Sequence, residues 1–228
     1  MRAVVLADTH IPDGSGRSLD ERVLAAVAEA DVVLHAGDVT GPDLLDRLGA
    51  SAPVHAVLGN NDGALARRLP TELALDLDGV RVALVHDAGP RAGRAARMAR
   101  RFPGAALVVY GHSHLPEDLD PDTGPRLFNP GSPTQRRMAP TRSFGLLDVE
   151  AGRIIDLRHV PLTTTLRGFH SEIVIEPDAA NGLEAVSAAQ CQHLRAVSPG
   201  RILDVRGNVG SAALAQIRET IAVILDIP

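Results

Sequence analysis

The chain of 228 residues contains no lysine and no tryptophan, has a single cysteine, and draws only 2% of its residues from Phe, Trp and Tyr. One cysteine, Cys191, excludes a disulfide within the chain and argues against a thiolate metal site, so any metal has to be bound by His, Asp, Asn or Glu. All 23 basic residues are arginine. We interpret this and the low aromatic content as a composition bias that carries no function.

A strong charge imbalance and long apolar runs are also missing. The formal net charge is -5, which argues against binding nucleic acid through bulk charge. The amino-terminal run Met1–Ala7 is too short for a signal peptide or a membrane span, and Asp8 ends it. With 45% hydrophobic residues the chain can bury a substantial core. We therefore expect a cytoplasmic globular protein that does not bind membranes.

Two histidines one residue apart follow a predicted buried strand. The strand is the apolar run Ala105–Tyr110, and Gly111-His112-Ser113-His114 comes directly after it. Side chains at positions i and i+2 of an extended segment point the same way, and neutral imidazole binds divalent metals. The tetrapeptide alone is a weak signal, because surface loops with two histidines are common.

Other predicted strands end in the same way. Potential ligands follow the strands Ala3–Ala7, Asp31–His35, Val54–Leu58 and Val80–Val85. Parallel strands end on the same edge of a sheet, and the ligands of α/β folds collect outside those carboxyl ends. We therefore expect one site that is formed by Asp8, His10, Asp38, Asn60, His86, His112 and His114.

The remaining patterns predict an α/β fold with an appended carboxyl-terminal element. Helices are expected over about Ser18–Ala30, Pro42–Leu48 and Arg91–Arg101, and hairpins over Leu73–Val85 and Ser143–Val160. The pattern changes after Leu162, so we divide the chain into a domain of residues 1–162 and an extension of residues 163–228. The extension is predicted to be a βαβα element with strands Glu172–Ile175 and Ile202–Val205 and helices Leu183–Val197 and Ala212–Ile227.

The candidate ligands comprise two acids, one amide and four imidazoles. This set suits Mn²⁺, Zn²⁺, Fe²⁺ or Ni²⁺ better than Ca²⁺. Seven side chains are too many for one ion and suit a pair. In two-metal centres a carboxylate usually bridges the ions, water between them becomes hydroxide near neutral pH, and both ions bind the phosphoryl group during in-line attack. The set therefore predicts hydrolysis of phosphate esters.

At this point the motifs resemble those of the calcineurin-like metallophosphoesterase superfamily, and in particular its small prokaryotic single-domain phosphodiesterases. The matching motifs are Asp8-Thr9-His10, Gly37-Asp38, Gly59-Asn60-Asn61-Asp62, His86, Gly111-His112-Ser113-His114 and Asn129-Pro130-Gly131-Ser132. The resemblance covers about residues 1–160 and implies a four-layer α/β/β/α sandwich. It implies one metal bound by Asp8, His10, Asp38 and His114, and a second bound by Asp38, Asn60, His86 and His112. Asp38 would bridge, and we assign the catalytic roles to Asp38, Asn60 and His112.

Asn61 departs from the superfamily pattern. Many members have a histidine there, which acts as general acid toward the leaving group, whereas asparagine cannot donate a catalytic proton at neutral pH. Three alternatives stay open: the leaving group departs unassisted, another residue assists, or the rate is low. The prokaryotic branch often lacks this histidine, so loss of activity does not follow.

Two functions from different classes remain. The first is a metal-dependent phosphoesterase that acts on small phosphate esters, diesters before monoesters, with two divalent ions, Mn²⁺ before Ni²⁺, Zn²⁺ or Fe²⁺. The second is a protein-interaction scaffold on the same fold, as in a retromer subunit that resembles this branch. The intact ligand set favours the enzyme. Residues 163–228 are a candidate oligomerisation element.

Several other side chains have plainer interpretations. We expect His35 and His55 to be buried core residues and Cys191 to pack on a helix. Asp62 is either a partner of a ligand or a turn former. The arginines at 91, 94, 97 and 100 either form a solvated helix face, which we favour, or gather phosphate.

Overall fold

The computed structural model describes residues 1–162, 170–184, 186–194, 205 and 207–226. Contacts divide the chain into two compact units, Met1–Thr163 and Thr164–Pro228. The first unit contains, in chain order, β1 (Arg2–Leu6), α1 (Glu21–Ala28), β2 (Val32–His35), α2 (Pro42–Gly49), β3 (Val54–Ala56), η1 (Gly63–Leu65), β4 (Glu72–Leu77), β5 (Val80–Val85), α3 (Arg94–Arg101), β6 (Leu107–Val109), β7 (Glu117–Leu119), β8 (Arg126–Asn129), β9 (Arg142–Glu150) and β10 (Arg153–Leu162).

Two five-stranded sheets form the first unit, with strand orders β10-β9-β1-β2-β3 and β4-β5-β6-β8-β7. In the first sheet β1, β2 and β3 run parallel, with Val4 opposite Val33 and Val33 opposite Val54. In the second sheet β5, β6 and β8 run parallel. Each sheet therefore presents the carboxyl ends of three neighbouring parallel strands.

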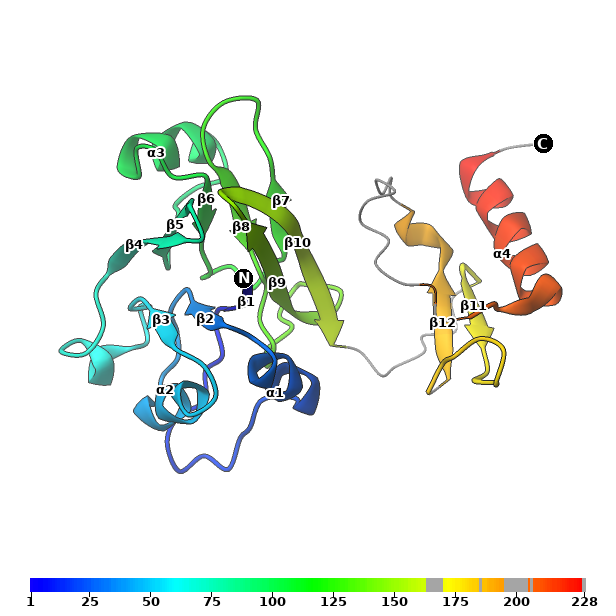
Figure 1. Ribbon diagram of the computed structural model, residues 1–228, viewed down its shortest axis with the longest axis horizontal. Coiled ribbons are helices and arrows are strands. Elements are labelled where there is room, and N and C mark those ends of the chain that lie inside the picture. Colours follow the sequence, from blue (N-terminus) through cyan, green and yellow to red (C-terminus); the bar gives the residue numbers. More distant parts are fainter. Residues whose placement is uncertain (163–169, 185, 195–204, 206, 227–228) are drawn as a thin grey trace. The chain divides into compact units, whose positions relative to one another are not determined.

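Side chains alternate between the two faces of each strand and thereby define four layers. Val5 packs between the sheets with Val82 of the second sheet, whereas Val4 faces outward and packs with α1 and α2. On the outer face of the second sheet, Val108 packs with Met98 of α3. The result is the α/β/β/α sandwich that the resemblance implies, with α1 and α2 covering one sheet and α3 the other (Figure 1).

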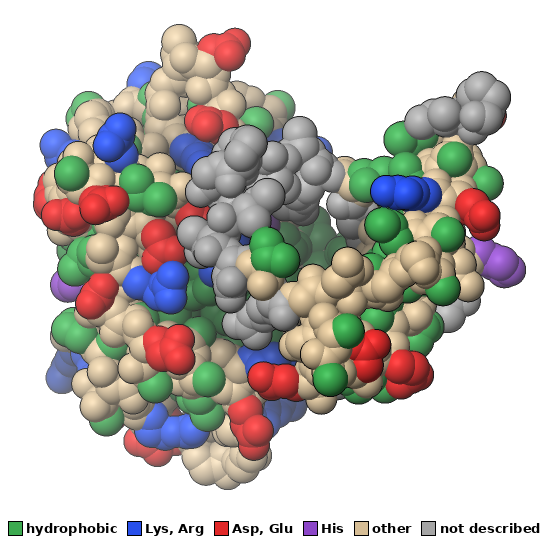
Figure 2. Space-filling model, turned by 45° about the vertical axis from the view of Figure 1, so that its right-hand side comes forward, with side chains coloured by type: hydrophobic (Ala, Val, Ile, Leu, Met, Phe, Trp, Pro, Cys, Tyr) green, Lys and Arg blue, Asp and Glu red, His purple; other side chains and the backbone are tan. Residues whose placement is uncertain are grey.

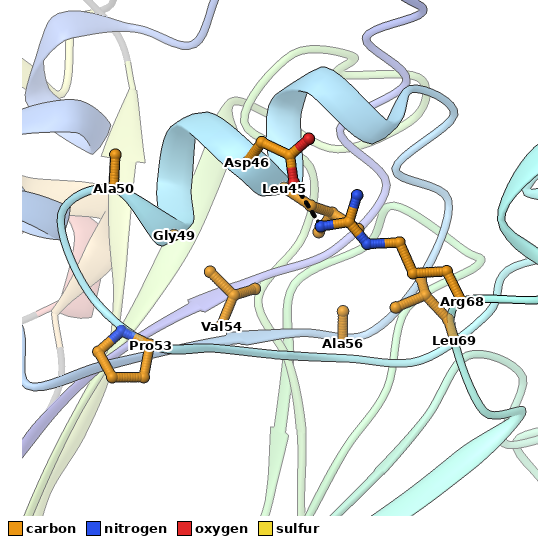
Figure 3. Close-up of a pocket in the computed structure, with 9 residues that line it drawn as sticks. All are labelled: Leu45, Asp46, Gly49, Ala50, Pro53, Val54, Ala56, Arg68 and Leu69. Atoms are coloured by element: carbon orange, nitrogen blue, oxygen red, sulfur yellow. Dashed lines mark hydrogen bonds and ion pairs between the residues drawn. The ribbon is translucent and has the colours of Figure 1, made fainter.

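A pocket of about 620 Å³ lies between α2 and the edge strand β3 (Figure 3). Its apolar lining includes Leu45, Val54 and Leu69, and an ion pair between Asp46 and Arg68 spans it at 2.5 Å. No candidate metal ligand lines this pocket.

The expected helices and hairpins of the first unit are confirmed, with ends that differ by a few residues in either direction. The helix expected from Ser18 begins at Glu21, because Asp20 accepts the backbone N–H of Arg22 and caps the first turn. β7 was not expected, since Glu-Asp-Leu has little strand propensity and becomes a strand only by pairing with β8.

In the second unit the helix expected over Leu183–Val197 is wrong. Ser187–Gln190 forms β12, which pairs antiparallel with β11 (Glu172–Ile175), and the short helix η2 (Cys191–His193) follows. Alanine has the highest helix propensity, but propensity is a weak predictor that tertiary contacts override, here the pairing with β11. Cys191 is buried as expected, but not on the predicted helix.

The rest of the second unit is only partly described. Residues 195–197 of that expected helix and all of the expected strand Ile202–Val205 except Val205 lie outside the described residues. The last expected helix is present as α4 (Gly210–Leu225). The described part is therefore a β-hairpin followed by the short helix η2 and by α4.

Two predictions from the sequence concern the surface charge and the length of the helices. On the face of the first unit that Figure 2 shows, acidic and basic side chains are interspersed. Among the described residues, no helix is both long enough and apolar enough to cross a membrane.

Candidate metal centre

All seven predicted ligands follow the carboxyl end of a parallel strand. The first sheet supplies Asp8 and His10 after β1, Asp38 after β2 and Asn60 after β3, and the second supplies His86 after β5 and both His112 and His114 after β6. From the residues alone we expected one sheet edge, but the candidate centre is built from the edges of two facing sheets.

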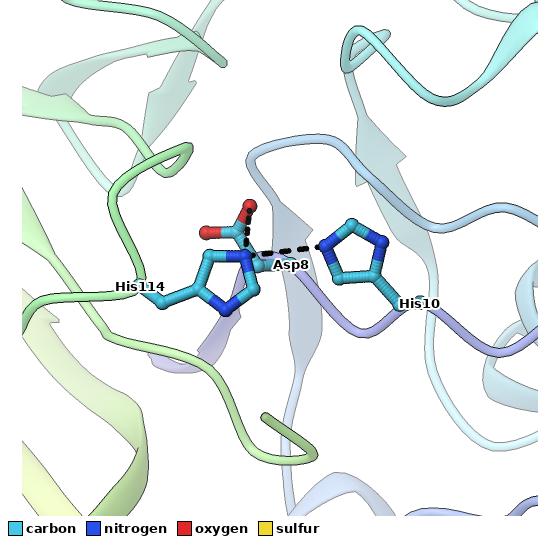
Figure 4. Close-up of side chains that lie close together, drawn as sticks. All are labelled: Asp8, His10 and His114. Atoms are coloured by element: carbon cyan, nitrogen blue, oxygen red, sulfur yellow. Dashed lines mark hydrogen bonds and ion pairs between the residues drawn. The ribbon is translucent and has the colours of Figure 1, made fainter. Parts of the chain in front are cut away.

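The first ligand group consists of Asp8, His10 and His114, whose ligand atoms lie within 4.8 Å of one another (Figure 4). His114 Nε2 lies 3.2 Å from His10 Nε2 and 3.5 Å from Asp8 Oδ1. His114 Nδ1 lies 3.3 Å from the carbonyl oxygen of Gln135, which can only accept, so Nδ1 carries the proton in the neutral ring. The lone pair of His114 Nε2 is therefore aimed at His10 and Asp8.

The second group consists of Asp8, Asp38 and His86. Asp38 Oδ2 lies 3.5 Å from His10 Nε2 and 3.6 Å from His86 Nε2. One carboxylate oxygen of Asp38 therefore lies between the two groups, which is where a bridging ligand belongs. Asp8 belongs to both groups, a feature that the resemblance did not imply.

Asn60 joins His86 to His112. Its side-chain oxygen Oδ1 lies 3.0 Å from His86 Nε2 and 3.0 Å from His112 Nδ1. His86 Nδ1 donates to the carbonyl oxygen of Ala36 at 2.8 Å, so the neutral ring carries its lone pair on Nε2. A lone pair that faces a carbonyl oxygen repels it unless a cation or a proton lies between them.

Burial and charge also fit a cation at this place. Asp8 is 0% exposed, and its Oδ2 has no hydrogen-bond partner within the described part of the chain. Burial and the neighbouring charge of Asp38 raise the pKa of Asp8 to about 8. Burial lowers the pKa of His114 to about 4 and also lowers that of His10. An unsatisfied buried carboxylate beside neutral imidazoles is the environment that a divalent ion stabilises.

Asp38 differs from Asp8. Burial acts to raise the pKa of Asp38, but hydrogen bonds from Asn61 and the proximity of His86 and His10 outweigh burial and lower it. The two carboxyl groups are thus driven apart in pKa, with Asp38 held as the carboxylate.

The backbone of this centre is strained. Five of the seven candidate ligands have a positive φ, and the angles are 55° at Asp8, 44° at His10, 58° at Asp38, 69° at His112 and 58° at His114. Such conformations are uncommon for residues other than glycine and cluster at functional sites. Loop contacts hold them in place, for example the bond from His10 N to the carbonyl oxygen of Asp38 at 2.9 Å.

Asp62 holds the loops that carry the ligands. Its buried carboxylate accepts the backbone N–H groups of Asp38 at 2.8 Å, Thr40 at 2.7 Å and Gly59 at 2.8 Å. The geometry favours the partner role over the turn former, although Asp62 holds backbone and not a histidine. Gly59 lies so close that a Cβ on it would be 2.1 Å from Asp38 Oδ1.

The Asn129–Ser132 turn links the loops of both sheets. Asn129 Nδ2 donates to the carbonyl oxygen of Gly111 at 2.9 Å, and Ser132 Oγ donates to that of Asp8 at 2.7 Å. The turn therefore fixes the His112 loop and the Asp8 loop relative to each other.

His35 and His55, the two histidines expected in the core, lie outside the ligand groups. His35 is buried as expected, with Nε2 3.0 Å from Thr9 Oγ1, and burial lowers its pKa to about 4. His55, on β3, is only half-buried.

The arginines at 91, 94, 97 and 100 do not share one role: Arg91 and Arg100 are exposed, as the favoured solvated face predicts, whereas Arg94 and Arg97 are partly buried and hydrogen-bonded. Arg94 donates to Tyr110 Oη at 2.9 Å and to Glu117 at 2.5 Å, and Arg97 donates to the carbonyl oxygen of Ala88 at 2.7 Å. Arg91 pairs with Glu117 at 3.3 Å. These side chains fasten the segment after His86 to the rest of the second sheet, a role that sequence spacing could not reveal.

Comparison with known proteins agrees with this geometry. Residues 1–152 match the model of the calcineurin-like phosphoesterase superfamily domain, and the chain belongs to that superfamily. A probable metallophosphoesterase of Methanothermobacter thermautotrophicus is 36% identical over 141 residues, which cover 59% of this chain and 78% of the relative. A probable metallophosphoesterase of Methanocaldococcus jannaschii is 34% identical over 149 residues, which cover 64% and 74%.

Solved structures share the fold. A Thermotoga maritima protein solved by NMR has a TM-score of 0.56 and 26% identity, covering 71% of this chain and 99% of that protein. Wild-type Vps29 of Entamoeba histolytica in complex with Zn²⁺ has a TM-score of 0.56 and 23% identity, with coverage of 71% and 99%. The family and the His and Asp groups together indicate divalent metal ions and phosphoesterase chemistry.

Proposed function

We propose that the chain is a phosphodiesterase with a dinuclear metal centre, in which the seven predicted ligands bind two divalent ions. The observation that carries this proposal is the position of Asp38 Oδ2, 3.5 Å from His10 Nε2 and 3.6 Å from His86 Nε2. A carboxylate oxygen within reach of a histidine from each proposed ligand set is typical of two-metal hydrolases.

The residues of the centre prepare it for this chemistry. Two divalent ions bound here would supply Lewis acidity toward the phosphoryl oxygens and would acidify a water for in-line attack on phosphorus. Asn61 orients Asp38, the carbonyl oxygen of Ala36 fixes the tautomer of His86, and that of Gln135 fixes His114. Donors of oxygen and nitrogen without sulfur favour Mn²⁺, and Zn²⁺ is an alternative that the Vps29 complex supports.

Diesters with good leaving groups suit the surroundings of Asn61. This exposed residue has an amide where many superfamily members have a proton donor, and the amide is already bonded to Asp38. Leaving groups of low pKa need no donor. We therefore propose that activated phosphodiesters are hydrolysed faster than alkyl esters.

Hydrolysis by protein stripped of metal with a chelator tests the proposal. Mn²⁺, Ni²⁺, Zn²⁺ and Mg²⁺ are restored one at a time, and a chromogenic phosphodiester is compared with its monoester, beside elemental analysis of the untreated protein. Restored turnover that prefers the diester supports the proposal. Two bound ions without turnover on either ester would favour the scaffold function.

Substitution of the bridging carboxylate sharpens this test. Asp38→Ala should lower kcat by at least about 10³-fold, because the shared ligand of both ions is lost. Asp122→Ala is the matched control, since Asp122 is exposed on the loop between β7 and β8. Activity that survives Asp38→Ala would exclude the two-metal mechanism.

The second unit is proposed to have a role apart from hydrolysis, because all seven candidate ligands lie in the first unit. Formation of a homo-oligomer through residues 163–228 stays a prediction. Light scattering, which measures the mass of the intact chain in solution, would test it.

A further inference from the structure

The segment Ser132–Arg137 is fastened to the loops of the candidate metal centre. Thr134 Oγ1 donates to the carbonyl oxygen of Thr9 at 2.7 Å, directly after Asp8. The carbonyl oxygen of Gln135 accepts from His114 Nδ1 at 3.3 Å. The segment therefore reaches the edge of the centre in a fixed position, although sequence analysis assigned it no role.

Arg137 ends this segment beside the candidate ligands. Its backbone φ is 46°, a left-handed conformation that is rare for arginine and often marks a functional position. Its Nη1 lies 3.4 Å from the carbonyl oxygen of His112, and the residue is exposed.

Arg137 differs from Arg91 and Arg94 of the segment after His86 in its lack of an ion pair among the described residues. Arg94 and Arg91 pair with Glu117, and Arg97 donates to backbone carbonyl groups. In contrast, no carboxylate of the described residues forms an ion pair with Arg137, and its bond to His112 is long for a structural contact. An unpaired guanidinium at the mouth of an anion-hydrolysing centre is available for the anion.

We propose that Arg137 binds the phosphoryl oxygens of the ester substrate at the mouth of the candidate metal centre. The planar guanidinium can donate two parallel hydrogen bonds to two phosphoryl oxygens. A lysine ammonium carries the same charge but lacks this paired geometry. His112, whose backbone carbonyl Arg137 contacts, is also exposed, so this part of the centre is open to a ligand. This inference rests on the proposed function for the identity of the ester, but its test also uses inorganic phosphate.

The test compares R137Q and R137K with the neighbouring variant R136Q. Arg136 is equally exposed and makes no side-chain bond that the described residues show, so R136Q removes the same charge one position away. For the metal-loaded protein, R137Q should raise both the KM for the phosphodiester and the Kd of inorganic phosphate by about 10- to 100-fold. R137K should recover part of this loss, and R136Q should change neither value by more than about 2-fold.

Two further measurements separate substrate binding from a structural role. If Arg137 binds substrate, kcat and the two bound ions per chain are retained in R137Q, as is the midpoint of thermal unfolding. Loss of metal or of kcat without a change in phosphate affinity would instead assign Arg137 to holding the His112 loop and overturn the proposal.

Phosphate binding keeps this test separate from the proposed function. If the wild type hydrolyses no ester but its calorimetric phosphate affinity depends on Arg137, the phosphodiesterase proposal fails and the anion site stands. Equal phosphate affinity in wild type and R137Q, or no phosphate binding by either, overturns the anion site.

Discussion

Asn61 donates hydrogen bonds to both carboxylate oxygens of Asp38, from its backbone N–H to Oδ1 at 2.9 Å and from its side-chain amide to Oδ2 at 2.7 Å. The position at which many superfamily members have a proton donor thus holds the central carboxylate instead. Since Asp38 lies close to both His10 and His86, its orientation would affect both of the proposed ions.

Asn61→Ala should therefore weaken Mn²⁺ binding by about 10-fold, because hydrogen bonds that orient a metal ligand typically contribute about 10- to 100-fold to metal affinity and the backbone bond is retained. Competition with a metallochromic chelator would measure the change. Asn208→Ala, which alters an exposed asparagine of the second unit, serves as the control. Unchanged affinity in Asn61→Ala would show that Asp38 is oriented without the amide.

Gly59 and Gly63 provide a matched pair for the packing around Asp38. A Cβ on Gly59 would lie 2.1 Å from Asp38 Oδ1 and 2.2 Å from its backbone nitrogen, whereas a Cβ on Gly63 would have no atom within 4 Å. Gly59→Ala should lower the free energy of unfolding by about 1–3 kcal/mol and weaken metal binding, because backbone has to move. Gly63→Ala should stay within about 0.5 kcal/mol of the wild type. Chemical denaturation measures both, and equal effects would contradict the expected close contact.

His35 should make the metal-free protein less stable in acid. Burial lowers its pKa from 6.5 to about 4, so between these pH values the unfolded chain binds a proton that the folded chain does not. Its contribution is fully present above pH 6.5 and is lost as the pH falls to about 4, by about 3 kcal/mol in total. Urea unfolding of chelator-treated protein from pH 8 to 4 should show a shallower decline for His35→Gln. If the free energy of unfolding declined equally in the wild type and in His35→Gln, protonation of the buried His35 would not destabilise the protein.

Metal stoichiometry can show whether the two ligand sets are separate. His114 belongs to one proposed set and His112 to the other, so His114→Ala and His112→Ala should each retain about one ion per chain where the wild type binds two. His55→Ala should keep both ions, since His55 lies on β3 apart from the ligand groups. Elemental analysis after dialysis measures the count. If either variant lost both ions, the two sites would depend on each other.

The positions of the ligands could be predicted from the sequence because each lies at the end of a short apolar run, and strand ends are among the clearest local signals. The sequence could not predict that the candidate ligands come from two sheets. The hairpin β4–β5 is visible as a turn, but the turn does not show that β5 joins a new sheet. The helix expected over Leu183–Val197 failed for the same reason, since strand pairing with β11 is a contact distant in sequence.

Two finer features of the centre could not be predicted from the sequence either. Asn61 contacts Asp38, and Arg137 contacts His112, because the loops adopt left-handed backbone conformations. No residue pattern predicts these conformations. Such conformations depend on the surrounding structure, for example on the three backbone bonds to Asp62.

The division of the ligands between two sheets has a kinetic consequence. Neither group is complete on one sheet, because His114 and His86 come from the second sheet and their partners come from the first. The free energy of ion binding becomes available only after the sheets have packed, which is late in folding. Bound metal should therefore prolong the lifetime of the native state by slowing unfolding, with little acceleration of folding. The ions would act as a reversible cross-link between the two halves of the sandwich.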